Sequence, residues 1–278
     1  MNTHYLKTRT AGLGAAFGAL IVLLALSLTA EAASSNWVET EGGRIRVSAL
    51  EPAADGTIKA ALDIELLPGW KTYWRDPGEA GVPPSFRVDR SSNVQSAEIH
   101  FPAPERIEDA YSIWAGYDYP VVLPITLKQE TPGTTSVLEA DIFLGICESV
   151  CIPLQTSFTL TLDPDEPANA FEKRMVARAF RSLPEVPGDD FKVHETVDSG
   201  DTLTLAVALP EDADGGEIFV TGPPGWRFET PRSKGVSGNT ATFEVPHSGP
   251  NEAGLSGETI HVVVKSAGRA MTTDIVID

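Results

Sequence analysis

Cysteine, methionine and histidine are scarce in this chain, and their scarcity limits the chemistry it can perform. The 278 residues contain two cysteines, three methionines and five histidines. The histidines are scattered without metal-ligand spacing, and no methionine or histidine lies close in sequence to the cysteines to complete a copper site. No Ser/His/Asp or paired-carboxylate arrangement indicates a hydrolase. The sequence therefore predicts neither a bound metal nor a cofactor.

Long apolar runs are also rare, and the one that is present lies at the amino terminus. Lys7 and Arg9 precede an apolar run over residues 11–28, and small residues follow at Ala30 and Ala32. This order is typical of a secretory signal peptide, with cleavage expected near Ala32. A retained anchor is the alternative, because about 18 apolar residues can just span a bilayer. We expect an exported protein of a bacterial periplasm, without membrane insertion after cleavage.

Basic residues are outnumbered, with 21 Lys and Arg against 39 Asp and Glu and a formal charge of −18. Removing residues 1–32 takes away two basic residues and one acidic residue, so the remaining 246 residues carry a charge of −19. This balance argues against nucleic acid or an anionic membrane surface as a partner. A length of 246 residues suits two ordinary domains better than one.

Alternating apolar and polar residues predict short β-strands through most of the chain. The predicted strands are residues 44–47, 58–66, 94–101, 121–128, 136–147 and 152–162, followed by 202–209, 217–221, 240–245, 259–265 and 271–277. Turns rich in Pro, Gly, Asn and Asp separate them. Many short strands with regular turns predict an all-β fold of antiparallel sandwiches.

One helix is predicted between the two β regions, over residues 167–182. Phe171, Met175 and Ala179 recur at helical spacing, and Pro167 suits the first turn. We interpret this helix as an interdomain connector. The resulting division is a signal peptide (1–32), a first β-sandwich (33–165), a helical connector (166–188) and a second β-sandwich (189–278). A shared Pro-Gly-Trp motif, at residues 68–70 and 224–226, indicates that the two sandwiches are related.

The two cysteines, Cys147 and Cys151, lie in an otherwise apolar stretch. On a flat strand they would be about 13 Å apart, whereas a disulfide needs Cα atoms within about 7 Å, so the chain must turn between them. Closing a five-residue ring stabilises by only about 2 kcal/mol, which favours a redox pair over a structural staple. A structural disulfide or a metal site is the alternative. Glu148 between the thiols disfavours a thiolate, so we expect the pair to react when a specific partner docks.

Aromatic residues gather in two groups before the cysteines. The groups are Trp70, Tyr73 and Trp74, and then Tyr111, Trp114, Tyr117 and Tyr119. Trp70 is readily explained as ordinary core. Residues 109–119 are too polar and broken to predict one strand, so we interpret them as a lid or a recognition surface. A lid over the disulfide would limit unwanted thiol exchange.

Four segments in this order resemble one known family. They are residues 69–78, residues 102–106, residues 121–125 and the cysteine segment 147–153. Together they resemble the periplasmic N-terminal domain of the DsbD thiol:disulfide interchange family, most closely its ScsB-like branch. The resemblance covers about residues 37–163, and the second sandwich is expected to match the extra β domain of ScsB-like proteins.

The resemblance implies two immunoglobulin-like sandwiches joined by a short helix, and a protein-disulfide reductase type of electron relay. It implies that Cys151 forms the mixed disulfide, that Cys147 resolves it, and that Tyr73 lies beside them. Tyr111 or Trp114 would provide the lid, although the family uses Phe-Tyr where this chain has Ala110 and Tyr111, and its cysteines are spaced more widely.

The resemblance also implies partners. The donor would be a membrane electron transporter of the DsbD/ScsB type or a thioredoxin-like protein, on a separate polypeptide. The clients would be periplasmic thioredoxin-fold proteins such as disulfide isomerases or cytochrome c maturation factors. The alternative function is a non-catalytic binding module, for a protein partner or copper, with a structural disulfide.

Overall fold

The computed structural model describes residues 33–78, 81–108, 113–250 and 254–278. The predicted signal peptide (1–32) and Tyr111 therefore lie outside the described residues. Within the described part, no helix has both the length and the apolar character that a membrane span needs. The same residues contain no group of three or more His, Cys, Asp or Glu side chains placed to hold a metal ion.

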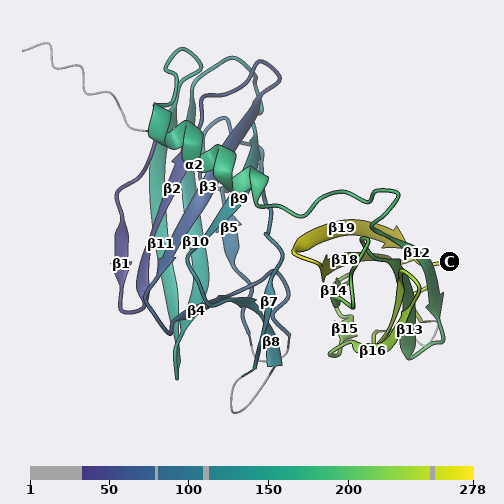
Figure 1. The fold of residues 1–278 in the computed structure, drawn as a ribbon. Helices are drawn as coiled ribbons and strands as arrows, with labels where there is room; N and C mark the ends of the chain where they lie inside the picture. The colour runs from purple at the N-terminus through teal and green to yellow at the C-terminus, as the bar shows by residue number, and fades with distance from the viewer. Residues whose placement is uncertain (1–32, 79–80, 109–112, 251–253) are drawn as a thin grey trace, which may run out of the picture. The chain divides into compact units, whose positions relative to one another are not determined.

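The first β region consists of two antiparallel sheets, shown in purple to teal in Figure 1. The first sheet has the order β1 (Val38–Thr40), β2 (Gly43–Ala49), β3 (Thr57–Leu66), β9 (Val121–Lys128) and β6 (Ser96–Ile99). The second sheet has the order β11 (Cys151–Leu162), β10 (Ser136–Cys147), β4 (Lys71–Tyr73), β8 (Ile113–Tyr117) and β7 (Glu105–Glu108), and β5 (Ser85–Arg87) also pairs with β10. The predicted antiparallel sandwich is confirmed.

The core of this sandwich follows from the alternation along its strands. In β10 every second residue from Leu138 to Ile146 is buried, and these side chains meet Ile45, Leu62 and Leu123 of the other sheet. Burying such apolar side chains is the main favourable contribution to folding. The odd-numbered residues of β10 therefore face away from the core, and Cys147 is one of them.

The second β region also has two sets of antiparallel strands. One set has the order β12 (Lys192–Asp198), β13 (Thr202–Ala208), β17 (Thr240–Ser248) and β15 (Arg227–Phe228), and β16 (Arg232–Ser237) also pairs with β17. The other has the order β14 (Glu217–Thr221), β18 (Thr259–Ser266) and β19 (Arg269–Val276). No strand of this region joins a sheet of the first in the described part of the chain. Residues 33–278 nevertheless form one unit by their contacts, so the domain boundaries stay an interpretation.

Helix α2 (Ala170–Arg181) begins three residues later than predicted. Asn169 caps it, because its side chain accepts hydrogen bonds from the amides of Phe171 and Glu172 at 2.8 and 3.1 Å, while the Glu172 carboxylate accepts one from the Asn169 amide at 2.7 Å. This reciprocal arrangement is a capping box, and it places the start of the helix after Asn169 rather than at Pro167.

The same helix packs on the first β region, where Figure 1 shows it lying across β2, β3 and β9. Met175, Val176 and Ala179 are buried against Ala61, whereas Phe171, at helical spacing from Met175, is 43% exposed. A second apolar face on β3 explains why Ala60 and Ala61 are both buried. The connector is therefore part of the first region's packing rather than a loose linker.

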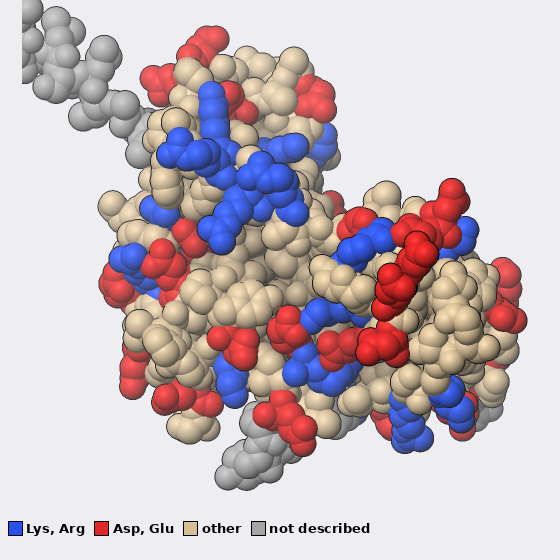
Figure 2. All heavy atoms as spheres, viewed as in Figure 1, with Lys and Arg blue, Asp and Glu red and all other residues tan. Residues whose placement is uncertain are grey.

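Charge is unevenly distributed over the surface. Figure 2 shows Lys and Arg gathered over α2, and Lys173, Arg174, Arg178 and Arg181 are the exposed basic residues of that helix. Elsewhere on this face the acidic and basic side chains are interspersed. The exposed surface of this helix is therefore basic, although the chain as a whole is strongly negative.

Candidate functional site

The two cysteines flank the loop of the hairpin that β10 and β11 form: Cys147 is the last residue of β10 and Cys151 is the first residue of β11. Its register runs from Ser136 opposite Leu162 to Cys147 opposite Cys151. The cysteines are joined by a disulfide bond, with Cα atoms 4.0 Å apart. The loop of residues 148–150 closes this hairpin although none of its residues has a positive φ. The predicted turn between the cysteines is confirmed.

The disulfide sits on the outer face of its sheet. Because directly opposite residues of antiparallel strands point to the same side, Cys147, Cys151 and Lys71 share this face. Tyr73 lies two residues along β4 and shares it too. Ile146 and Thr72, the neighbouring positions, are fully buried on the other side. The site is thus supported by the sandwich core without being part of it.

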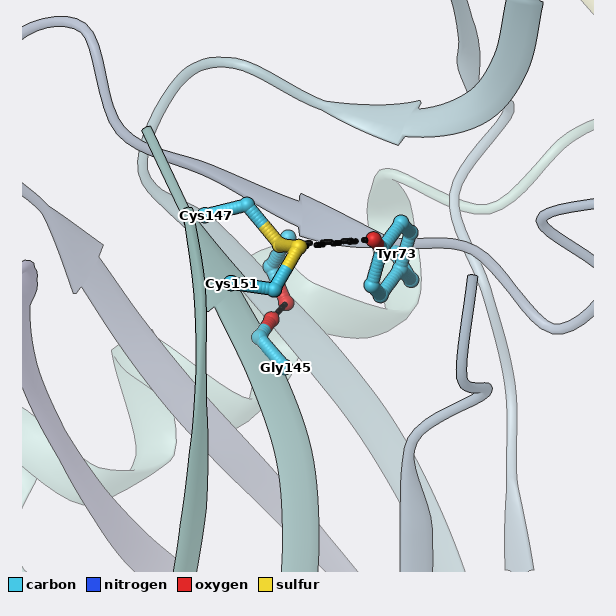
Figure 3. The surroundings of a disulfide bond; sticks show 5 residues. Tyr73, Gly145, Cys147 and Cys151 are labelled. Atoms are coloured by element: carbon cyan, nitrogen blue, oxygen red, sulfur yellow. Dashed lines mark hydrogen bonds between the residues drawn. A yellow bond between two sulfur atoms is a disulfide. The ribbon is translucent and has the colours of Figure 1, made fainter. Parts of the chain in front are cut away.

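Tyr73 places its hydroxyl against both sulfur atoms, as Figure 3 shows. Its Oη lies 3.0 Å from Cys151 Sγ and 3.3 Å from Cys147 Sγ. Disulfide sulfurs carry no hydrogen, so the hydroxyl must be the donor. The aromatic ring itself is 5% exposed. Tyr73, which the family resemblance expects beside the cysteines, thus contacts both sulfur atoms.

Two glycines leave room for the aromatic rings beside the disulfide. A Cβ on Gly145 would lie 2.9 Å from Tyr73 Cε2, and a Cβ on Gly116 would lie 2.4 Å from Trp114 Cζ3. Both distances are below ordinary van der Waals contact. Gly145 is two residues before Cys147 on the same face of β10, and its carbonyl accepts the Thr72 hydroxyl at 2.9 Å. Sequence reasoning missed both glycines, because neither belongs to a turn.

Trp114 and Ile107 complete a small apolar cluster with Tyr73 and Cys147. The Trp114 and Tyr73 rings meet edge to face, with centroids 4.8 Å apart. Trp114 lies in β8, where it is paired with Ile107 of β7. Residues 109–119 are not expected to form one strand, and the structure has a shorter one over residues 113–117, because neighbouring strands β4 and β7 supply hydrogen-bond partners that the local sequence does not reveal.

Tyr117 and Tyr119, the two described tyrosines of that group, have other neighbours than the cysteines. Tyr117 is fully buried in the sandwich core, where its hydroxyl donates to the Pro102 carbonyl at 2.8 Å. Burial raises the pKa of its phenol well above the ordinary value. Tyr119 is 39% exposed and packs edge to face on Tyr117. Tyr117 is therefore a structural residue rather than a lid residue.

The two cysteines differ sharply in exposure. Cys147 is 4% exposed, beneath Tyr73 and Trp114, whereas Cys151 is exposed. Val150, next to Cys151 at the tip of the hairpin, is 71% exposed. A thiol approaching from solvent therefore reaches Cys151 before Cys147.

Charged side chains also border the pair. Lys71 stands opposite Cys147 in the β4–β10 ladder, and its Nζ lies 5.8 Å from the Trp114 ring centroid. Glu148 is exposed in the hairpin loop. A cation therefore faces the buried cysteine and a carboxylate follows it in sequence, so the expectation based on Glu148 alone left out one of two opposing charges.

Comparisons with known proteins agree with this geometry. The family model described as "Thiol:disulfide interchange protein DsbD, N-terminal" matches residues 43–163. The crystal structure of the N-terminal periplasmic domain of ScsB from Proteus mirabilis is similar at a TM-score of 0.71 and 28% identity, covering 89% of this chain and 100% of that chain. FdeC, an Escherichia coli adhesin, reaches a TM-score of 0.20 at 14% identity over 89% of this chain and 64% of its own, which is too low to indicate a shared fold. No curated protein matches.

Fold and site together define a class: an immunoglobulin-like β-sandwich that carries a disulfide on the outer face of one sheet. Residues 43–163 match the family model of the N-terminal domain of the thiol:disulfide interchange protein DsbD. The similarity to the ScsB domain extends into the second β region, because 89% of the chain is far more than residues 43–163.

Proposed function

We propose that this chain is a periplasmic thiol:disulfide exchange protein that relays electrons through Cys147 and Cys151. The observation that carries the proposal is the asymmetry of the pair: one sulfur belongs to an exposed residue, the other is buried, and one tyrosine hydroxyl contacts both. Exchange rates depend on which sulfur is accessible. A disulfide that served only to staple a hairpin would not need this arrangement.

Reduction of the protein proceeds by two exchange steps. A donor thiolate attacks Cys151 Sγ, the disulfide breaks, and Cys147 leaves as a thiolate that takes up a proton. The second thiol of the donor then attacks its own sulfur in the mixed disulfide, so the donor is oxidised and Cys151 is released. Two electrons and two protons have then passed to the pair.

Delivery to a client reverses these roles. The Cys151 thiolate attacks the client disulfide and forms a mixed disulfide, and the client's other sulfur leaves as a thiol. Cys147 then attacks Cys151 Sγ, which restores the intramolecular disulfide and releases the reduced client. Tyr73 assists in both directions, because its hydroxyl can donate a hydrogen bond to the Cys151 thiolate.

The proposed partners follow from the family resemblance. The donor is a dithiol protein, either thioredoxin-like or a membrane transporter of the DsbD/ScsB type, and the client is a periplasmic thioredoxin-fold protein such as a disulfide isomerase or a cytochrome c maturation factor. The family match and the similarity to a periplasmic ScsB domain support this assignment. Cleavage of residues 1–32 near Ala32 would place the protein in the same compartment.

Two measurements test the proposal. The reduction potential is measured by equilibration with glutathione buffers, and reduction by a thioredoxin-like donor is followed in parallel. We expect exchange with the donor and a potential above about −300 mV. A lower potential together with no exchange would mark a structural bond and overturn the proposal.

A trapping variant identifies the partner. Cys147→Ser leaves Cys151 without its resolving thiol, so a mixed disulfide with the client should accumulate on Cys151. The matched control is Cys151→Ser, in which the remaining thiol is buried. Equal trapping by both variants would contradict the assigned roles. If binding of a partner or of copper survives replacement of both cysteines, the alternative of a non-catalytic binding module is correct.

A further inference from the structure

The hairpin formed by β7 and β8 has two faces with different neighbours. Ile107 and Trp114 are directly opposite each other in its ladder and share the face that covers Cys147. Arg106 and Ala115, the next pair, lie on the opposite face. That second face meets the second β region.

Arg106 makes the most specific of these contacts. Its Nε donates to Glu217 Oε1 at 3.1 Å, and its Nη2 donates to the Ile218 carbonyl at 2.9 Å. Its guanidinium also lies over the Phe219 ring, 4.6 Å from the centroid. All three partners belong to β14. Burial lowers the pKa of Arg106 and Glu217 opposes that shift, as expected for a partly desolvated ion pair.

Two further contacts hold the same region. Lys265 of β18 donates to the Pro104 carbonyl at 3.0 Å and pairs with Glu105 at the start of β7. Phe219 packs edge to face on Trp74, with centroids 5.8 Å apart, and joins the core of the first β region. The second region therefore contributes charged and apolar contacts to the back of the hairpin.

The hairpin has little support within its own sheet. β7 is an edge strand, and β8 shares only two ladder pairs with the three-residue strand β4. Two loop hydrogen bonds, from the Trp74 amide to the Ala115 carbonyl and from the Ala115 amide to the Pro77 carbonyl, extend this pairing. Elements with few packing and ladder contacts open locally at low cost in free energy.

We propose that the second β region is a positioning clamp: it presses the β7–β8 hairpin against the disulfide and thereby keeps Ile107 and Trp114 over Cys147. This role rests on the proposed exchange at Cys147 and Cys151. While the hairpin is closed, Ile107 and Trp114 keep water from the Cys147 sulfur. Lys71 and the Tyr73 hydroxyl lie on the same face, but the missing hydration disfavours the thiolate that must leave. Opening the hairpin admits water to that sulfur and speeds attack on Cys151. Arg106 is thus a positioning residue.

The test compares two arginines in residues 33–278. Arg106→Met removes the contacts to Glu217 and Ile218, whereas the control Arg269→Met removes an arginine that pairs with Glu185 and Asp190 instead. The measurement is the second-order rate constant for reduction of the disulfide by dithiothreitol, followed by thiol labelling and mass spectrometry. We expect about a tenfold increase for Arg106→Met and less than about a twofold change for Arg269→Met.

A second readout separates local opening from general loss of stability. Hydrogen exchange should become faster in residues 105–108 and 113–117 of Arg106→Met, and remain at the parent rate in β13 and β17. Arg106→Lys keeps the positive charge but loses the planar set of guanidinium donors. Its disulfide should therefore be reduced more slowly than that of Arg106→Met and faster than that of the parent.

Equal reduction rates for Arg106→Met and Arg269→Met, whether both unchanged or both raised, would overturn the clamp. If Arg106→Met does not fold, Lys265→Met removes the contacts to Pro104 and Glu105 and is judged by the same comparison. Dithiothreitol acts without any partner protein. A parent protein that fails to exchange with a thioredoxin-like donor therefore counts against the proposed function and leaves this test intact.

Discussion

The two β regions contain the same turn, yet only one of them builds a redox site on it. Residues 68–71 and 224–227 both read Pro-Gly-Trp followed by a basic residue. Gly69 and Gly225 adopt φ of 86° and 94°, a conformation that favours glycine. In both turns the tryptophan amide donates to a carbonyl three residues earlier, at 3.0 and 3.1 Å. The sequence echo is therefore a repeated local structure.

Both tryptophans are also seated in the same way. Trp70 lies on Gly42 and Trp226 lies on Gly249, and a Cβ on either glycine would come within 2.1 or 2.3 Å of the indole Cε3. The absence of a side chain at these glycines lets the ring pack directly on backbone. The repeated unit thus includes a glycine that is remote in sequence from the turn.

The regions diverge after the turn. In the first, β4 enters its sheet between β10 and β8 and delivers Tyr73 to the disulfide. In the second, β15 pairs with β17, and the position equivalent to Tyr73 is the exposed Glu229. The same turn therefore leads into a strand in both regions, but only the strands that flank β4 bring a disulfide next to it.

Replacing both cysteines by serine should have the largest effect. Cys147→Ser with Cys151→Ser abolishes exchange entirely, while unfolding in urea shows a loss of only about 2 kcal/mol, because the closed ring is short. The second β region should be unaffected in hydrogen exchange. Failure of the whole chain to fold would show that the disulfide is a structural element instead.

Adding a methyl group beneath each tryptophan should come next. Gly42→Ala and Gly249→Ala are each expected to cost about 2 kcal/mol of unfolding free energy, because the indole must move. Only Gly42→Ala should also change the rate of disulfide reduction, since Trp70 adjoins β4. Gly215→Ala, where nothing lies within 4 Å of the new Cβ, is the control. An equal change in the reduction rate of both variants would show that the disulfide does not depend on the Trp70 turn in particular.

Removing the hydroxyl of Tyr73 should have a smaller, purely chemical effect. Tyr73→Phe deletes the donor beside both sulfurs, so the reduced protein should react about tenfold more slowly with a disulfide probe at neutral pH. Stopped-flow thiol exchange measures the rate. Tyr119→Phe, at an exposed tyrosine away from the sulfurs, should react like the parent. An unchanged rate in Tyr73→Phe would show that the hydroxyl plays no part in the exchange and that Tyr73 only packs beside the disulfide.

The smallest expected effect concerns the second region alone. Asp198 accepts hydrogen bonds from His247 and from the amides of Leu255 and Gly200 at 2.8 to 3.0 Å. Burial opposes ionisation, but the hydrogen bonds from these groups lower the pKa of this carboxyl overall. A lowered pKa contributes stability that is present above the unfolded value and is lost as the pH falls through the folded one.

Asp198→Asn should therefore cost about 1 kcal/mol of unfolding free energy at neutral pH. The difference from the parent should begin to shrink as the pH falls below about 4, the pKa of an aspartate in the unfolded chain, and should vanish as the pH falls through the lower pKa of the folded state. Urea unfolding at several pH values measures it, with Asp201→Asn as the matched control. A difference that stays constant with pH would show that charge at Asp198 does not matter.

Much of the fold could be predicted because alternation is a local property. Strand β9 and strand β10 have the predicted bounds, and β11 begins one residue earlier than predicted. By contrast β4, with three residues, is too short to show a period, and β8 reads as loop because its partners are distant in sequence. Tyr73 and Trp114 were placed near the cysteines by family resemblance rather than by any pattern.

From the sequence alone it follows that a disulfide between Cys147 and Cys151 requires a turn, since residues four apart on a straight strand are too distant to be joined; the structure shows this bond. Which cysteine is buried, which hydroxyl contacts the sulfurs and what supports the covering hairpin become visible only in the folded chain. The reason is physical: turn and alternation arise from neighbouring residues, whereas exposure arises from strands that meet after folding. Cys147 is buried by Tyr73 and Trp114 because β4 and β8 pair beside β10.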